Sequence, residues 1–166
     1  MRHWRGVLAC VATLALAACN EGAPAPQAEA TEVPEEIAAE PMAEIVDTQG
    51  IGTPMAERVA TIGLINKRNN LTRDIEMSPG ESRRVDDVII RLAACERTAP
   101  WESPVQTGAF VQVFVNERRD AGGDAEWYRI FSGWLFKENP SINVVEHPIY
   151  DVWVKDCAMS FPGEEA

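Results

Sequence analysis

The stretch AFVQVFVN, residues 109–116, decides the fold class because its side chains alternate in character from one residue to the next. One face of an extended chain is aliphatic here, made of Ala109, Val111, Val113 and Val115. The opposite face alternates phenylalanine with Gln112 and Asn116. Alternation with period two is the pattern of a β-strand, and two partly apolar faces indicate a central strand covered on at least one side.

The same period continues outward from this stretch, in short runs separated by turn residues. Strands are predicted at 59–66, 71–77, 82–85, 88–96, 109–118, 127–136 and 149–157. Turns are predicted at Asn69-Asn70, at residues 78–81 (SPGE) and at Gly122-Gly123. The connections are short enough for neighbouring strands to pair directly. We therefore predict an all-β domain over residues 58–161, an antiparallel β-sandwich or small β-barrel of about seven strands, with a tail at 162–166.

The N-terminus has the features of an export signal. Arg2 and Arg5 precede an apolar run that is too short to span a bilayer. Residues 16–19 (LAAC) resemble the lipobox of bacterial lipoprotein precursors, which predicts a signal peptide at 1–18 and lipidation of Cys19. The alternative is ordinary signal-peptidase cleavage, which leaves a soluble periplasmic protein. Because Asn20 is not aspartate, the outer membrane is weakly favoured over the inner membrane as the site of anchoring.

A tether is predicted over residues 19–57. Residues 20–57 carry nine acidic residues, no basic residue and no aromatic, with five prolines among them. Such a composition buries too little apolar surface to offset the entropy of ordering, which predicts a disordered Ala/Pro/Glu linker. Residues 35–40 are expected to form a transient helix at most, because Pro41 stops it. The alternative to a spacer is an acidic interaction tail.

Four segments carry a resemblance to a known family: EMSPGESR at 76–83, LAACE at 92–96, IFSGWLF at 130–136 and VEHPIYDVWVKDC at 145–157. Together they resemble the domain of unknown function 2155, an uncharacterised family of secreted Gram-negative envelope proteins. The resemblance covers roughly residues 60–157 and departs from the family pattern at 66–70 (NKRNN). It implies a shared fold and export, and it supplies no activity.

Cys95 and Cys157 are the two cysteines that remain when Cys10 leaves with the signal and Cys19 is lipidated. In an oxidising compartment they are expected to form a structural disulfide. A redox role is disfavoured because a C-x-x-C motif is absent from the sequence. Strand alternation predicts a bridge between the ends of neighbouring strands, with Trp153 packed beside it, rather than a bridge buried between two sheets.

Catalytic chemistry has little support in the sequence. His147 is the one imidazole outside the signal, which excludes multi-histidine zinc sites, and no metal or cofactor is expected. Ser132 lacks the G-x-S-x-G elbow of a hydrolase, and the carboxylates near His147 show no spacing that makes them converge. We expect His147 to be a structural loop residue. A net charge of −11 argues against nucleic-acid binding.

The aromatics are the remaining candidates for binding. They are Trp101, Trp134, Tyr150 and Trp153, and His147 is a further possible binding residue. Burial in the core is the favoured interpretation for most of them, and Trp101, in a proline-bounded loop, is expected to stay the most exposed. The expected function is a lipid-anchored periplasmic module that binds or scaffolds another envelope protein without catalysis. The alternatives are a carbohydrate- or peptidoglycan-binding module that uses exposed aromatics, and a hydrolase centred on His147.

Overall fold

The structure is a computed structural model that describes residues 32–45 and 50–164. The predicted signal peptide and the lipidation site at Cys19 lie outside the described residues. Within the described part of the chain, no helix combines the length and the apolar character needed to cross a membrane.

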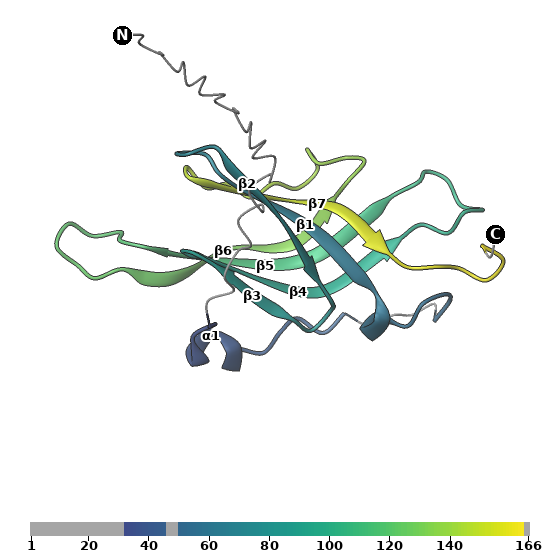
Figure 1. The fold of residues 1–166 in the computed structure, drawn as a ribbon, viewed down its shortest axis with the longest axis horizontal. Coiled ribbons are helices and arrows are strands. Elements are labelled where there is room, and N and C mark those ends of the chain that lie inside the picture. The colour runs from purple at the N-terminus through teal and green to yellow at the C-terminus, as the bar shows by residue number, and fades with distance from the viewer. Residues whose placement is uncertain (1–31, 46–49, 165–166) are drawn as a thin grey trace, which may run out of the picture.

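Seven strands form two antiparallel sheets in the described residues (Figure 1). The three-stranded sheet has the order β2-β1-β7, and the four-stranded sheet has the order β3-β4-β5-β6. The strands are β1 (Val59–Asn66), β2 (Leu71–Met77), β3 (Ser82–Val85), β4 (Val88–Arg97), β5 (Thr107–Glu117), β6 (Glu126–Phe136) and β7 (Tyr150–Ala158). Each predicted strand is present with its ends within two residues of the prediction, so the all-β fold class is confirmed.

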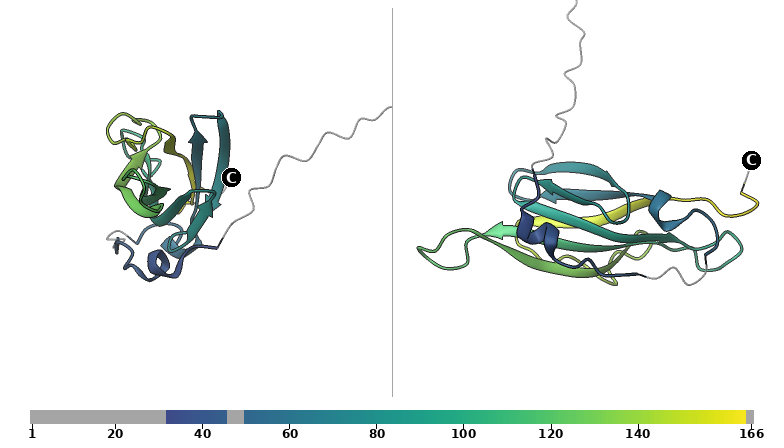
Figure 2. Two further views of the ribbon diagram at one scale, coloured as in Figure 1. Left: turned by 90° about the vertical axis from the view of Figure 1, so that its left-hand side faces the viewer. Right: turned by 90° about the horizontal axis from the view of Figure 1, so that it is seen from below.

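The core lies between the two sheets, which stack as two layers (Figure 2). Strand β5 is an internal strand, and its four aliphatic side chains from Ala109 to Val115 are buried there. The facing sheet contributes Ile62 from β1 and Val152 from β7. Burial of aliphatic side chains from both layers in one cluster is the arrangement of a β-sandwich.

The turns follow the predicted chemistry, although one of them has a different role. Asn70 has φ 57° in the β1–β2 hairpin, and Gly122 has φ 96° at the tip between β5 and β6. The turn at 78–81 closes with a hydrogen bond from the Glu81 N–H to the Ser78 carbonyl. The prediction that neighbouring strands pair directly is wrong at this turn, because β2 and β3 belong to different sheets. The turn therefore carries the chain from one layer to the other.

The disulfide between Cys95 and Cys157 is present and joins the two sheets through the core. The predicted position at the ends of neighbouring strands is wrong. Each strand has one extra residue relative to its partner, Ala93 in β4 and Lys155 in β7. An extra residue reverses the alternation for the residues after it, so both cysteines turn inward. Their exposed fractions are 0% and 2%.

Trp153 lies away from the bridge, which corrects the prediction that it packs beside the sulfurs. It is the direct partner of Gly63 in the β1–β7 pair, and its indole covers the space where a Cβ of residue 63 would stand. Val152 and Val154 on either side point into the core. Trp153 therefore packs on the outer face of the three-stranded sheet.

The chain before β1 makes more contacts than a disordered linker. Helix α1 (Glu35–Ala39) packs on the outer face of the four-stranded sheet, and a 3-10 turn, Met55–Glu57, leads into β1. Pro41 ends α1 as predicted, because Glu40 before it takes an extended conformation. Parts of the region predicted as a linker, at Ile37 and at Thr53, thus contact the rest of the domain.

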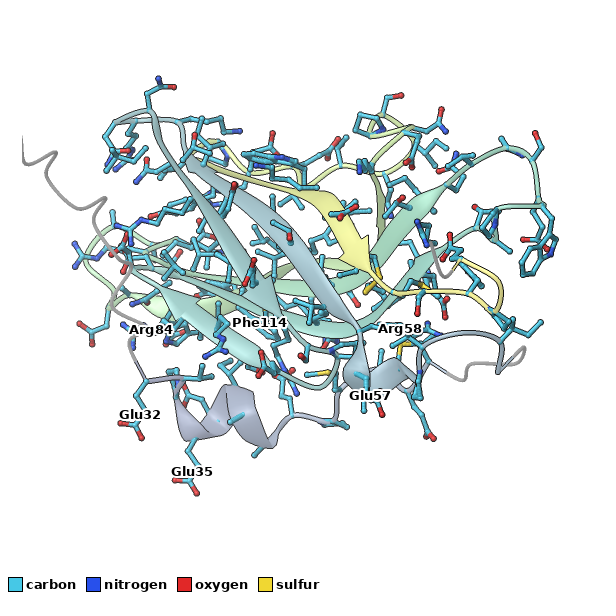
Figure 3. All side chains as sticks on the ribbon, turned by 45° about the vertical axis from the view of Figure 1, so that its right-hand side comes forward. Glu32, Glu35, Glu57, Arg58, Arg84 and Phe114 are labelled. Carbon is cyan, nitrogen blue, oxygen red and sulfur yellow. A yellow bond between two sulfur atoms is a disulfide. The ribbon has the colours of Figure 1, made fainter. Side chains whose placement is uncertain are left out.

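Arg58 anchors residues 50–57, which we call the entry segment, beside the disulfide (Figure 3). Its guanidinium is buried, with Nε donating to the Thr53 carbonyl at 2.7 Å and Nη1 donating to the Cys95 carbonyl at 3.0 Å. Nη1 also lies 2.6 Å from the Glu96 carboxylate. The Thr53 N–H donates to the Ser160 carbonyl, and the Ser160 N–H donates to the Thr53 hydroxyl, so both ends of the domain meet here.

Candidate functional site

His147 lies near the end of the long loop between β6 and β7, and both of its ring nitrogens hold the loop in place. Nδ1 accepts the N–H groups of Ile149 at 3.2 Å and Tyr150 at 3.1 Å. Because Nδ1 is an acceptor, the ring proton is on Nε2, which donates to Glu117 at 3.2 Å. The imidazole also stacks on the Tyr150 ring, with 5.4 Å between centroids. This geometry is that of a capping residue.

The charges around His147 keep its hydrogen-bond partner, the Glu117 carboxylate, ionised. The Arg119 guanidinium, bonded to Glu117 at 2.7 Å, is the main cause that lowers the pKa of that carboxyl. The His147 hydrogen bond lowers the pKa of Glu117 further, while partial desolvation raises it. On the other side, Lys67 Nζ donates to the His147 carbonyl at 2.6 Å. The loop is therefore fastened by charge-assisted hydrogen bonds.

The serine considered as a hydrolase partner lies far along the sheet from His147. Ser132 on β6 is the direct partner of Gln112 on β5. Glu117, which contacts His147, lies five positions further along β5 than Gln112, and this spacing corresponds to about 17 Å of extended chain. The structure therefore brings no Ser132–His147 pair together.

The four candidate aromatics occupy four different places. Tyr150 is buried in the core, and desolvation raises the pKa of its hydroxyl. Trp134 pairs edge to face with Phe110 on the outer face of the four-stranded sheet. Trp153 covers Gly63 on the other sheet, and Trp101 is 62% exposed in the loop between β4 and β5. They do not form one stacking platform.

An apolar groove of about 90 Å³ lies where β6 and β7 adjoin. Next to it the loop between the strands exposes Ile142 (66%) and Val144 (50%). Asn143 between them anchors the loop by donating from Nδ2 to the Trp134 carbonyl at 3.0 Å. The groove is lined by Leu135, Phe136, Pro140, Asn143, Val144, Asp151, Val152, Trp153 and Val154.

Of the sequence candidates, this groove contains only Trp153; the residues from the loop and from β6 were missed. The available signal was a pair of aliphatic residues in a segment bounded by Pro140 and Pro148, where no strand is predicted. Exposed aliphatic side chains beside an apolar groove are typical of surfaces that contact another macromolecule.

A second depression, of about 440 Å³, lies between the entry segment and the C-terminal residues. It is lined by residues 52–54, Glu57 and 160–164. Phe161 at its wall packs edge to face with Trp101, 5.8 Å between centroids. This is the one place in the described residues where a mostly exposed indole adjoins a depression.

The described part of the chain does not meet the requirements of a metal site. Within residues 32–45 and 50–164, no three His, Cys, Asp or Glu side chains are grouped so as to hold a metal ion.

Comparison with known proteins places the chain among proteins of unassigned function. No solved structure matches it significantly. An uncharacterised protein of Rickettsia prowazekii (strain Madrid E) is 25% identical over 93 residues, which is 56% of this chain and 56% of that relative. The family model described as "Uncharacterized protein conserved in bacteria (DUF2155)" matches residues 60–157. These residues run from β1 to the second cysteine of the disulfide, so the chain belongs to the DUF2155 family.

Proposed function

We propose that this chain is a lipid-anchored protein of the bacterial cell envelope, held in the periplasm through Cys19, whose β-sandwich binds or scaffolds another envelope protein without catalysis. The observation that carries the binding role is the exposed pair Ile142 and Val144 beside the β6–β7 groove. Exposed aliphatic residues lose unfavourable contact with water when a partner covers them.

The sequence supplies the support for the location. The apolar run before residues 16–19 (LAAC) fits an export signal with a lipidation site, and several acyl chains on one residue give durable attachment. A disulfide between the two cysteines of the domain suits an oxidising compartment. A partner in the same compartment is therefore the kind of ligand we propose.

Site-specific photocrosslinking in the producing bacterium tests the binding role. A photoreactive residue at Ile142 is expected to give a discrete crosslinked adduct. The matched control is the same residue at Asp120, which is exposed on the β5–β6 tip. Equal or absent adducts at the two positions would contradict the proposal that the groove is the binding surface.

A carbohydrate- or peptidoglycan-binding role is the second candidate, favoured by the exposed Trp101 ring beside Phe161. Aromatic faces stack on sugar rings, and the adjoining depression has room for one. Retention on purified sacculi that is lost in Trp101→Ala would support this role. Passage of the wild-type chain through sacculi and soluble glycans without retention would exclude it.

We do not propose a hydrolase. The third expectation required His147 to act on a nucleophile, and both of its ring nitrogens are engaged in the loop cap. Wild-type growth of a strain that carries His147→Ala in place of the native gene would exclude the hydrolase.

A further inference from the structure

The outer face of the four-stranded sheet carries an apolar centre surrounded by arginines. Its centre is Ile89 on β4 and Phe114 on β5, which are direct partners, with Trp127 packed against them. We call this surface the outer patch. Its residues are Ile89, Phe114 and Trp127, flanked by Arg84, Arg91 and Arg129.

Residues 32–40 of the same chain occupy the outer patch (Figure 3). Ile37 is 5% exposed and packs with Val33 on the apolar centre. At the two ends of the segment, the carbonyls of Glu32 and Glu40 accept hydrogen bonds from arginines of the patch. Arg84 donates to the first at 3.3 Å and Arg91 to the second at 2.8 Å. Recognition therefore uses one apolar anchor and the main chain.

The acidic side chains of this segment make little direct use of the arginines. Glu35 and Glu36 are exposed, and Figure 3 shows Glu35 and Glu32 pointing away from the sheet. Only Glu40 comes near, with its carboxylate 3.6 Å from Arg129. The segment carries no basic residue, so its charge is complementary to the patch.

Residues 32–40 can leave the outer patch without disrupting the core. Helix α1 has five residues between Pro34 and Pro41, and the described residues supply no side chain that caps it. A helix of this length is not stable without its tertiary contacts. Ile37 and the two residues it covers form a cluster separate from the main core, so its departure leaves the contacts between the sheets intact.

The patch also contains a polar group that its present occupant does not satisfy. Arg91 is 3% exposed, and its Nε and Nη1 have no hydrogen-bond partner among the described residues. Gln112, its direct partner on β5, is likewise buried with Oε1 unpaired. Buried guanidinium donors without acceptors are unfavourable, and a carboxylate is the group that best satisfies them.

We propose that the outer patch is a docking surface for an acidic segment of a partner protein, and that residues 32–40 are a displaceable occupant in cis. The partner segment places an aliphatic residue where Ile37 lies and a carboxylate against Arg91. This surface is on a different part of the molecule from the β6–β7 groove, so its test is independent of crosslinking from Ile142.

Fluorescence anisotropy with a labelled peptide of residues 31–42 (TEVPEEIAAEPM) tests the proposal on the full chain. The peptide is expected to bind the Ile37→Ser chain about tenfold more tightly than the wild-type chain, because the wild-type occupant competes at high effective concentration. Adding Arg129→Glu is expected to weaken the binding, whereas adding the matched change Arg118→Glu, on an exposed residue outside the patch, leaves it unchanged. A peptide with its four glutamates replaced by glutamine is expected to bind more weakly.

No binding to the Ile37→Ser chain, or equal binding to the wild-type chain and the Ile37→Ser chain, would overturn the docking surface. Equal binding of the glutamine peptide would overturn the acidic partner. Hydrogen exchange on the wild-type chain gives a measurement that requires no variant. Amides of residues 35–40 are expected to exchange while those of β4 and β5 stay protected, and equal protection would overturn displacement.

Discussion

Trp153 lies directly over Gly63, its partner across the β1–β7 pair, so closely that a Cβ on residue 63 would overlap the indole ring. The glycine is thus required by its neighbour rather than by a turn. The indole covers the outer face of the three-stranded sheet at this point, close to the groove that it also lines.

Gly63→Ala is expected to destabilise the domain by about 2 kcal/mol, because the new methyl group meets a packed ring. Trp153→Ala in the same chain removes the overlap, so the two changes are expected to be non-additive in urea denaturation. Gly123→Ala is the control, since its Cβ makes only ordinary contacts. Additive losses would contradict the contact.

The disulfide is expected to contribute about 4 kcal/mol, because it closes a loop with a sequence separation of 62. Cys95→Ala with Cys157→Ala should lower the free energy of unfolding by this amount. Reductant should destabilise the wild-type chain and leave the double variant unchanged. Non-reducing mass spectrometry that finds two free thiols in purified periplasmic material would contradict the bridge.

Removal of the loop cap at His147 is expected to cost about 1–3 kcal/mol, because His147→Ala leaves two backbone N–H donors without their acceptor. His147→Asn retains a short acceptor that reaches the N–H two residues on, and we expect it to recover part of the loss. Thermal unfolding measures both. Equal stability of the alanine and asparagine variants would show that the hydrogen-bond acceptor at position 147 does not contribute to stability.

Stability at acid pH is expected to depend on Glu117. Its pKa is lowered in the folded state, mainly by Arg119 and also by His147. The folded state therefore binds a proton at Glu117 less readily than the unfolded state does. The stabilisation that the ionised carboxylate gives is complete above the unfolded pKa, near 4.5, and is lost as the pH falls through the folded pKa. Glu117→Gln should show a smaller loss of stability than wild type over this range. Parallel acid denaturation curves would contradict the linkage.

Lipid attachment is expected to depend on Cys19 alone. Cys19→Ser should move the protein from the membrane fraction to the soluble periplasmic fraction, because it removes the thiol that we propose carries the acyl chains. Cys10→Ser is the control and should leave the distribution unchanged. A wild-type protein that is already soluble would instead favour ordinary signal-peptidase cleavage.

Much of the fold could be predicted from local pattern. Alternation located every strand, and Asn70 and Gly122 have the positive φ angles that their turns require. Elimination of the N-terminal cysteines identified the disulfide pair. The candidate site was less accessible, because the exposure of Ile142 and Val144 depends on how the loop is anchored to β6.

The sequence by itself determined the strands, the turn residues and which two sulfurs pair, because each of these follows from residues close in the chain or from counting. Only the tertiary structure decided that β2 and β3 separate into different sheets, that Ala93 and Lys155 turn the cysteines inward, and that Ile37 packs on Phe114. These outcomes depend on pairing between distant segments, where a one-residue change of register reverses the face to which a side chain points.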